Sequence, residues 1–197
     1  MIAFVLSGGG SRGAFEVGAL RALLANGIQP DLLVGTSAGA VNATAIALDP
    51  TLEGVERLER LWLRMDEDVF YSPNPLVVAL RLMLKKPSLY SNARFYRFVR
   101  AEILPQARTF SDLIKARLFL TGVDLERGDL HVFGDTPDDS VIEAIMASTA
   151  IQPYFAPWAY RGRRYIDGGF ISNLPLLAAL ERGASEIYAI DLTTKKL

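Results

Sequence analysis

A serine stands at the centre of the pentapeptide Gly35-Thr36-Ser37-Ala38-Gly39, which has the pattern G-x-S-x-G. The apolar run Leu32 to Val34 precedes it, and small residues from Ala38 to Leu48 follow it. A strand, a sharp turn and a helix in this order expose a serine hydroxyl at the carboxyl end of the strand. The motif therefore predicts a nucleophilic serine, although a serine that only caps a helix would have the same local pattern.

A second segment, Gly8-Gly9-Gly10-Ser11-Arg12-Gly13, follows the apolar run Ile2 to Leu6. Consecutive backbone N–H groups without side chains can form a pocket for negative charge, such as an oxyanion hole. The same letters match the dinucleotide-binding pattern G-x-G-x-x-G, which also requires an acidic residue near the end of the second strand. That strand ends in Gly35 and has Asp31 at its beginning, so an oxyanion hole is favoured. A tight strand-to-helix turn without chemistry is the remaining alternative.

The third segment, Asp167-Gly168-Gly169, follows the predicted strand Arg164 to Ile166. A serine nucleophile needs a base within hydrogen-bonding distance. The chain has one histidine, His131, which precedes Asp167, so the order Ser…Asp…His cannot be built. If Ser37 is a nucleophile, its base is therefore expected to be a carboxylate, and Asp167 is the best placed. Taken alone, the Asp-Gly pair would indicate only a turn.

The composition is that of a globular protein, with 197 residues, 50% of them hydrophobic, and a net charge of −1. This length fits one domain, and the charge excludes a strong positive field for nucleic acid. The absence of cysteine and the single histidine exclude disulfides and sites with several histidines. No apolar run reaches the roughly 20 residues of a membrane span, and the N-terminus lacks the basic start of a signal peptide. We therefore expect a cytoplasmic protein.

Strands and helices alternate around the motifs, which predicts an α/β fold with a mainly parallel sheet. The expected strands are 2–6, 32–34, 164–166 and 187–190, with a hairpin formed by 118–123 and 130–133. The expected helices are 13–26, 38–48, 53–65, 141–147 and 175–181, and short helices outside the sheet are expected within 72–104.

Together, the three motifs resemble the patatin-like phospholipase family, whose pattern is G-G-G-x-R/K-G, then G-x-S-x-G, then D-G-A/G. Ala144 to Pro157, Asn173 to Pro175 and Ile187 to Asp191 also resemble family segments. The resemblance implies a three-layer α/β/α fold with a mainly parallel central sheet. It also implies a single domain over 1–197, with a helical cap insertion at about 70–105.

Two features depart from the family pattern. Gln152-Pro153 stands where many members carry Pro-Gly, which would reshape the loop near the site. The chain also ends soon after Asp191, where members usually continue. We therefore expect a shortened C-terminus that lacks an edge of the sheet or a wall of the pocket.

The resemblance implies a catalytic dyad in which Ser37 attacks an ester carbonyl and Asp167 first accepts its proton and then activates water. The oxyanion would be bound by Gly8, Gly9 and Gly10. The motifs are completed by Arg12, Gly13, Gly35, Gly39, Gly168 and Gly169. The implied substrates are phospholipids, lysophospholipids, acylglycerols or simple esters, without a metal or organic cofactor. An acyltransferase with the same acyl-enzyme, a dinucleotide-binding module and an inactive lipid-binding domain are the alternatives.

Residues 74–98 are a candidate contact with a membrane surface. Asn74-Pro75 is typical of a helix start, and Leu76 to Leu84 is apolar except for Arg81, which shares one stripe with Lys85. The segment is either a helix buried against the core or a flap over the active site. As a flap, it would bind acyl chains or insert into a bilayer surface, with its basic residues on anionic head groups.

Overall fold

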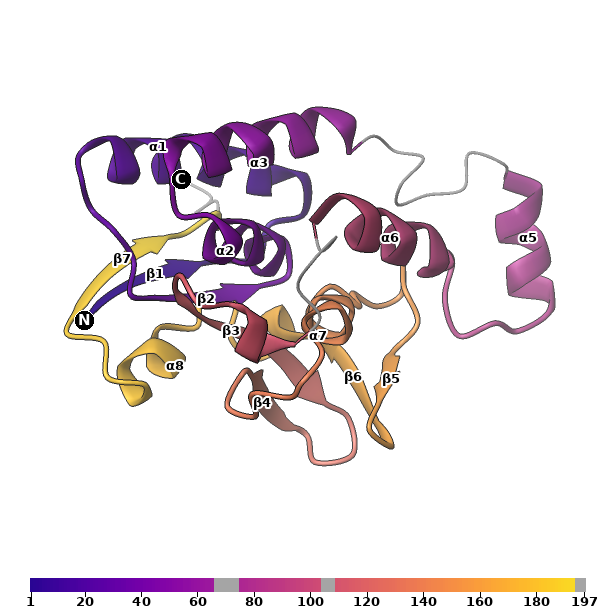
Figure 1. Cartoon of the computed structure of the whole chain (residues 1–197). Helices are drawn as coiled ribbons and strands as arrows, with labels where there is room; N and C mark the ends of the chain where they lie inside the picture. The colour runs from indigo at the N-terminus through magenta and orange to yellow at the C-terminus, as the bar shows by residue number, and fades with distance from the viewer. Residues whose placement is uncertain (66–74, 104–108, 194–197) are drawn as a thin grey trace.

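The computed structural model of the chain, which describes residues 1–65, 75–103 and 109–193, is built around one mixed sheet (Figure 1). Within these residues seven strands run in the order β5-β6-β3-β2-β1-β7, with β4 on β3. The parallel part consists of β1 (Ile2–Leu6), β2 (Leu32–Thr36), β3 (Arg117–Asp124) and β7 (Glu186–Ile190). The antiparallel part adds β4 (Asp129–Phe133), β5 (Trp158–Tyr160) and β6 (Arg163–Asp167) to β3.

Helices cover both faces of the sheet. Successive residues of a strand point to opposite sides, so the apolar runs of the buried strands make both faces apolar. Phe4 and Leu6 join the larger apolar cluster on one face, whereas Ala3 and Val5 join a smaller cluster with Ala178 on the other. The larger cluster contains residues of α1 (Ala14–Ala25), α2 (Ala38–Leu48), α3 (Leu52–Arg64), α6 (Ala93–Phe98) and α7 (Val141–Ser148). The other face carries α8 (Leu176–Glu181). The three-layer α/β/α prediction is therefore confirmed, with a sheet that is parallel from β3 through β2 and β1 to β7 and antiparallel where β4, β6 and β5 join it.

The strands β2 and β6 meet end to end along one edge of β3. Thr36, the last residue of β2, pairs with Thr121, and Asp167, the last residue of β6, pairs with the next residue, Gly122. The other edge of β3 pairs with β4 over the same stretch. Because β2 and β6 run in opposite directions, their carboxyl ends converge at this point, and the residue that follows β2, Ser37, is brought towards Asp167.

The segment 75–103 contains helices of two kinds. The residues of α6 and of the following π-helical turn η2 (Val99–Ile103) belong to the core, since Phe95, Val99 and Ile103 are buried. In contrast, α5 (Pro75–Met83) lies apart from the sheet (Figure 1), and its exposed side chains include Leu76, Leu80, Leu82 and Met83. The predicted helix start at Asn74 lies outside the described residues. Over the described ranges, none of the helices combines the length and the apolar character that crossing a bilayer requires.

Candidate active site

Ser37 occupies a strained turn between β2 and α2. Its φ is 55° and its ψ is −119°, a region that side-chain-bearing residues adopt at a cost of about 1–3 kcal/mol. The two flanking glycines allow the turn: a Cβ on Gly35 would lie 2.4 Å from the carbonyl oxygen of Gly39, and one on Gly39 would lie 2.4 Å from that of Leu6. The sequence around Ser37 thus allows the backbone approach that places the hydroxyl at the carboxyl end of β2.

The turn is held by a residue that the motifs did not identify. Ser148, the last residue of α7, is fully buried, and its hydroxyl accepts a hydrogen bond of 2.9 Å from the backbone N–H of Ser37. The one available signal was a serine at the end of the otherwise apolar stretch Ala144 to Ala147.

Asp167 ends β6 with one carboxylate oxygen satisfied and the other unpaired. Its Oδ1 accepts the backbone N–H of Gly169 at 2.8 Å, whereas its buried Oδ2 has no hydrogen-bond partner among the described residues. Burial raises the pKa of Asp167 above its usual value, and interactions with the Ser37 side chain and the Gly169 backbone lower it only in part. Gly168 permits the close approach to β3, because a Cβ there would lie 2.5 Å from Oγ1 of Thr121. Asp167 therefore combines a raised basicity with a free oxygen.

The glycine loop between β1 and α1 is fixed by Asn173. The N–H of Gly8 donates to the carbonyl oxygen of Asn173 at 3.0 Å, and the Asn173 side chain donates back to the carbonyl oxygen of Gly8 at 3.0 Å. A Cβ on Gly8 would lie 2.4 Å from Oδ1 of Asn173. The next two N–H groups, of Gly9 and Gly10, donate to no acceptor in the described part of the chain. The N–H of Gly8 is therefore occupied, while those of Gly9 and Gly10 are available to a ligand.

Two further loop residues have structural contacts. Arg12 donates from Nε to the carbonyl oxygen of Gly9 at 3.3 Å. Gly13 ends the short turn η1 (Gly10–Gly13) and is the N-cap of α1, and a Cβ there would lie 2.8 Å from the Cβ of Ala38. Gly13 thus lets α1 approach the start of α2, which carries Ser37 at its N-terminus.

The three motifs converge on one cavity of about 390 Å³. Its lining consists of Gly8, Gly9, Gly10, Arg12, Ser37, Ile151, Asp167, Gly169, Phe170 and Asn173. Ile151, Phe170 and Asn173 were not predicted as site residues; the first two supply an apolar wall, and both are partly exposed. No described residue of 75–103 is among the residues that line this cavity.

Two other candidate groups lie elsewhere. His131 is on β4, where it contacts the ring of Phe133 with centroids 4.5 Å apart, and burial lowers its pKa. It is not among the residues of the cavity. Asp31 accepts the N–H of Ile2 at 2.7 Å, at the opposite end of β1 from the glycine loop, where it could not bind a ribose next to that loop. Within the described ranges, no three His, Asp or Glu side chains gather as a metal site would require.

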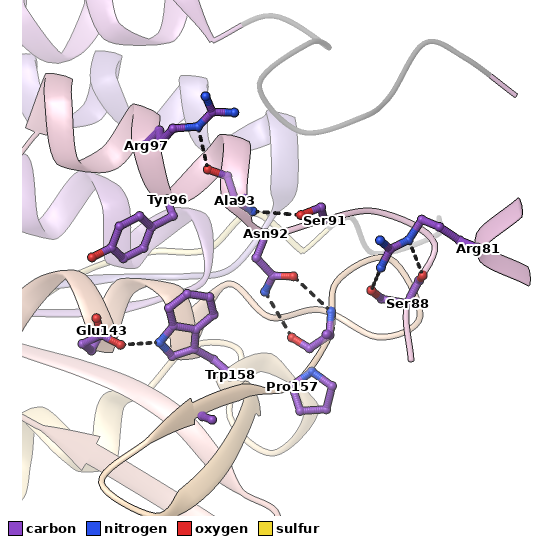
Figure 2. Close-up of a pocket in the computed structure, with 12 residues that line it drawn as sticks. Arg81, Ser88, Ser91, Asn92, Ala93, Tyr96, Arg97, Glu143, Pro157 and Trp158 are labelled. Carbon is purple, nitrogen blue, oxygen red and sulfur yellow. Dashed lines mark hydrogen bonds between the residues drawn. The ribbon is translucent and has the colours of Figure 1, made fainter. Parts of the chain in front are cut away.

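A larger cavity, of about 670 Å³, lies between α6 and β5 (Figure 2). Tyr96 and Trp158 stack in it with ring centroids 5.8 Å apart, and Nε1 of Trp158 donates to Glu143 at 2.7 Å. Neither Ser37 nor Asp167 lines it. It is therefore separate from the cavity where the motifs meet.

The segment before α6 supports the loop that follows α7. The N–H of Leu89 donates to the carbonyl oxygen of Pro153 at 3.1 Å, and the N–H of Tyr90 donates to that of Tyr154 at 2.9 Å. Figure 2 shows Asn92 continuing this contact, and its side-chain amide exchanges two hydrogen bonds with the backbone of Ala156. The same loop includes Ile151 of the cavity that Ser37 and Asp167 line, so this segment braces one wall of that cavity from outside.

Comparison with known proteins places this chain in a family. The family model described as patatin-like phospholipase matches residues 4–180. Human patatin-like phospholipase domain-containing protein 6 is 29% identical over 193 residues, which covers 97% of this chain and 13% of that protein. Lysophospholipase NTE1 of Lodderomyces elongisporus is 28% identical over 203 residues, covering 97% and 12% respectively. The chain thus spans 12–14% of the length of these curated relatives and of rat patatin-like phospholipase domain-containing protein 7.

Solved structures share the fold at lower identity. VipD from Legionella pneumophila superposes with a TM-score of 0.60 and 17% identity, covering 88% of this chain and 46% of that chain. ExoU from Pseudomonas aeruginosa, in complex with SpcU, gives a TM-score of 0.54 and 23% identity, covering 76% and 38%. Since the family model matches most of the sequence and the fold agrees, the chain belongs to the patatin-like phospholipase family.

Proposed function

We propose that this chain hydrolyses acyl esters of phospholipids, lysophospholipids or related lipids, with Ser37 as the nucleophile and Asp167 as the base. The observation that carries the proposal is that Ser37, the unpaired Oδ2 of Asp167 and the free N–H groups of Gly9 and Gly10 border one cavity. The family membership and the relatives named phospholipase and lysophospholipase support a lipid ester as the substrate.

In the proposed reaction, the Ser37 hydroxyl attacks the ester carbonyl while its proton passes to Oδ2 of Asp167. The raised pKa of Asp167 favours this transfer, because a more basic carboxylate takes the proton more readily. The carbonyl oxygen becomes negatively charged, and the N–H groups of Gly9 and Gly10 are the donors that would stabilise it. We do not include Gly8 among the donors, because its N–H is bonded to Asn173.

Collapse of the tetrahedral intermediate expels the alcohol, which receives the proton held by Asp167 and leaves Ser37 acylated. Asp167 then takes a proton from water, whose oxygen attacks the acyl carbon, and the proton returns to Ser37 as the fatty acid leaves. An alcohol in place of water would give acyl transfer from the same intermediate. The partly exposed Ile151 and Phe170 would contact the acyl chain at the cavity mouth.

A fluorophosphonate probe tests this proposal directly, because it reacts only with an activated serine. We expect it to modify Ser37, as located by peptide mass spectrometry, and to leave the Ser37→Ala variant unlabelled. Turnover of p-nitrophenyl esters and lysophosphatidylcholine should be lost in the same variant, and added glycerol would reveal acyl transfer as acylglycerol product. Labelling at another serine, or equal labelling of Ser37→Ala, would exclude Ser37 as the nucleophile.

We also propose that α5 and the residues after it contact a lipid surface. Leu76, Leu80 and Met83 are more than half exposed, and Lys85 and Lys86, which follow the helix, are exposed as well. Arg81 points back to the body instead, donating from Nε to the carbonyl oxygen of Ser88 at 3.0 Å. Exposed apolar side chains beside two lysines match the acyl region and the anionic head groups of a membrane surface.

Co-sedimentation with phosphatidylglycerol vesicles tests this contact. Leu80→Asp and the double change Lys85→Glu with Lys86→Glu should each reduce binding, with soluble-ester turnover kept. The matched control is Leu63→Asp on α3, whose side chain is equally apolar and 81% exposed but lies outside α5. Equal binding by the wild type and the α5 variants would show that α5 does not mediate the contact.

A further inference from the structure

A carboxylic acid is buried behind the glycine loop. Glu16, the third residue of α1, is fully buried, and its Oε2 accepts a hydrogen bond of 2.7 Å from the Asn42 side chain. Its Oε1 is buried without a hydrogen-bond partner among the described residues. The proposed mechanism with Ser37 and Asp167 does not use this group. Burying an acid with one unsatisfied oxygen lowers the stability of the fold, so its presence requires an explanation.

Asn42 links Glu16 to the end of the glycine loop. Its Nδ2 also donates to the carbonyl oxygen of Gly13 at 2.9 Å, and its Oδ1 accepts Nε1–H of Trp62 at 2.8 Å. Both amide hydrogens are therefore used, one on the loop and one on Glu16. A single amide on α2 thus connects α1, the loop and α3.

The surroundings of Glu16 keep it uncharged at neutral pH. Burial raises its pKa to about 8, and the hydrogen bond from the Asn42 side chain and the nearby Ser7 backbone lower the pKa only in part. Among the described residues, the groups that influence the pKa of Glu16 are uncharged: the Ser7 backbone after β1 and the Asn42 side chain on α2, which in turn accepts the indole N–H of Trp62 on α3. Arg12, the charged residue of η1, lines the catalytic cavity instead.

We propose that Glu16 is a positioning residue of the glycine loop, which it holds through Asn42 and Gly13, and that its ionisation releases the loop. This inference rests on the proposed function only in taking Gly9 and Gly10 as oxyanion donors. An ionised Glu16 would be a buried charge without a cationic partner, so it would draw donors or water towards itself. The shared amide of Asn42 would then no longer hold the carbonyl oxygen of Gly13 in place.

The first test is the pH profile of kcat on a soluble ester, corrected for spontaneous hydrolysis. We expect the kcat of the wild type to fall at least tenfold above about pH 8, with KM little changed, because the loop stabilises the transition state. Glu16→Gln, which is isosteric and cannot ionise, should keep kcat flat across this range, whereas Glu16→Ala should lower it at every pH. An alkaline fall that persists unchanged in Glu16→Gln would overturn the inference.

The shared amide has its own matched pair of variants. Asn42→Ala should lower kcat by tenfold or more, because it disconnects Gly13 from the network. Thr44→Val is the control on the same helix, since buried Thr44 donates only to the carbonyl oxygen of Ala40 in its own helix, at 2.7 Å. Equal losses of kcat in the two variants would mean that any change of a buried polar residue on α2 has this effect, which would contradict a specific role of Asn42.

A readout without catalysis separates this inference from the proposed function. The chain has two tryptophans, so a Trp158→Phe background leaves Trp62, whose indole donates to Asn42, as the reporter. Its fluorescence should titrate with a midpoint near pH 8, and the transition should disappear when Glu16→Gln is added. If Trp62 titrates with Glu16 but fluorophosphonates do not label the protein, the role of Glu16 is retained and the proposed hydrolase is rejected. If the Trp62 fluorescence does not depend on Glu16, only the role of Glu16 is rejected.

Discussion

The hydroxyl of Ser148 accepts the backbone N–H of Ser37 at 2.9 Å, so the last residue of α7 holds the turn that carries the proposed nucleophile. Ser37 has a positive φ, and such strain persists only when surrounding contacts determine the backbone. The hydrogen bond is one of those contacts. It makes α7 a support for the candidate site, although no residue of α7 lines the cavity around Ser37.

Ser148→Ala should therefore lower both stability and turnover. The change leaves the Ser37 N–H without its acceptor, which costs about 1–3 kcal/mol, and we expect kcat/KM to fall about tenfold. Ser140→Ala is the matched control, because Ser140 precedes the same helix and its side chain makes no capping hydrogen bond. Thermal unfolding and ester kinetics of the two variants check the prediction, which fails if they behave alike.

Asp167→Asn should abolish turnover and yet stabilise the fold at neutral pH. Burial holds the folded-state pKa of Asp167 above its usual value. Protonation therefore favours folding: this stabilisation is fully present below about pH 3.8 and is lost as pH rises through the folded-state pKa. At pH 7 the wild type carries a buried carboxylate, and asparagine removes that charge. We expect kcat to fall by about 10⁴-fold and Tm to rise by about 2–4 °C for each kcal/mol gained.

The control for this stability effect is a buried aspartate with the opposite pKa shift. Burial acts to raise the pKa of Asp124, but hydrogen bonds from Arg163 and from the backbone outweigh it and hold the pKa below its usual value. Asp124→Asn should thus lower Tm at pH 7. Calorimetry of both variants at pH 7 decides the matter, and a lower Tm for Asp167→Asn would contradict the expected sign.

Gly10→Ala should impair catalysis more than stability. Gly10 has φ of 59°, and a Cβ on it would have no neighbouring atom within 4 Å, so alanine meets backbone strain of about 1–2 kcal/mol but no clash. Gly27, at φ 76° with equally open space, provides the matched control beyond α1. We expect similar losses of Tm in Gly10→Ala and Gly27→Ala, but a fall in kcat of about 10²-fold only in the former. Equal kinetics would argue against the loop as the oxyanion donor.

His131→Ala should keep turnover within about twofold of the wild type, because the imidazole packs against Phe133 and Tyr165 outside the cavity. A modest loss of Tm is expected from the removed ring contacts. Measurement of kcat/KM on a short-chain ester checks this, and a loss of several hundredfold at unchanged Tm would point to a histidine base.

The placement of Ser37 and the glycine loop could be predicted because local sequence determines it. Each motif follows a short apolar strand, and the carboxyl ends of neighbouring parallel strands lie at the same edge of a sheet. Asp167 could be proposed only because its side chain is a carboxylate. Its position depends on β6, an antiparallel strand that meets the end of β2 along the edge of β3. That junction depends on pairing between distant segments, which leaves no local pattern.

The segment 75–103 shows a second limit of sequence reasoning. The residues of α5 are mostly aliphatic and those of α6 include three aromatic side chains, but Phe95 of α6 is buried in the core and Leu80 of α5 is exposed. Apolar periodicity indicates that a helix has an apolar face. Whether the rest of the chain buries that face depends on tertiary packing, which the local pattern does not specify. Asn173 was missed for a related reason, because its partner Gly8 is far away in sequence.

The contacts of the glycine loop also fix the order in which the site can be completed during synthesis. The loop is synthesised before the residues that hold it, since Gly8 is held by Asn173, and the hydroxyl of Ser7 accepts the N–H of Leu192 at 2.8 Å. A Cβ on Gly9 would lie 2.6 Å from Leu192, which packs directly on the loop. A nascent chain on the ribosome that carries Ser37 but has not yet released residues near 190 lacks both anchors. The glycine loop thus acquires its working shape from residues that are made later in synthesis.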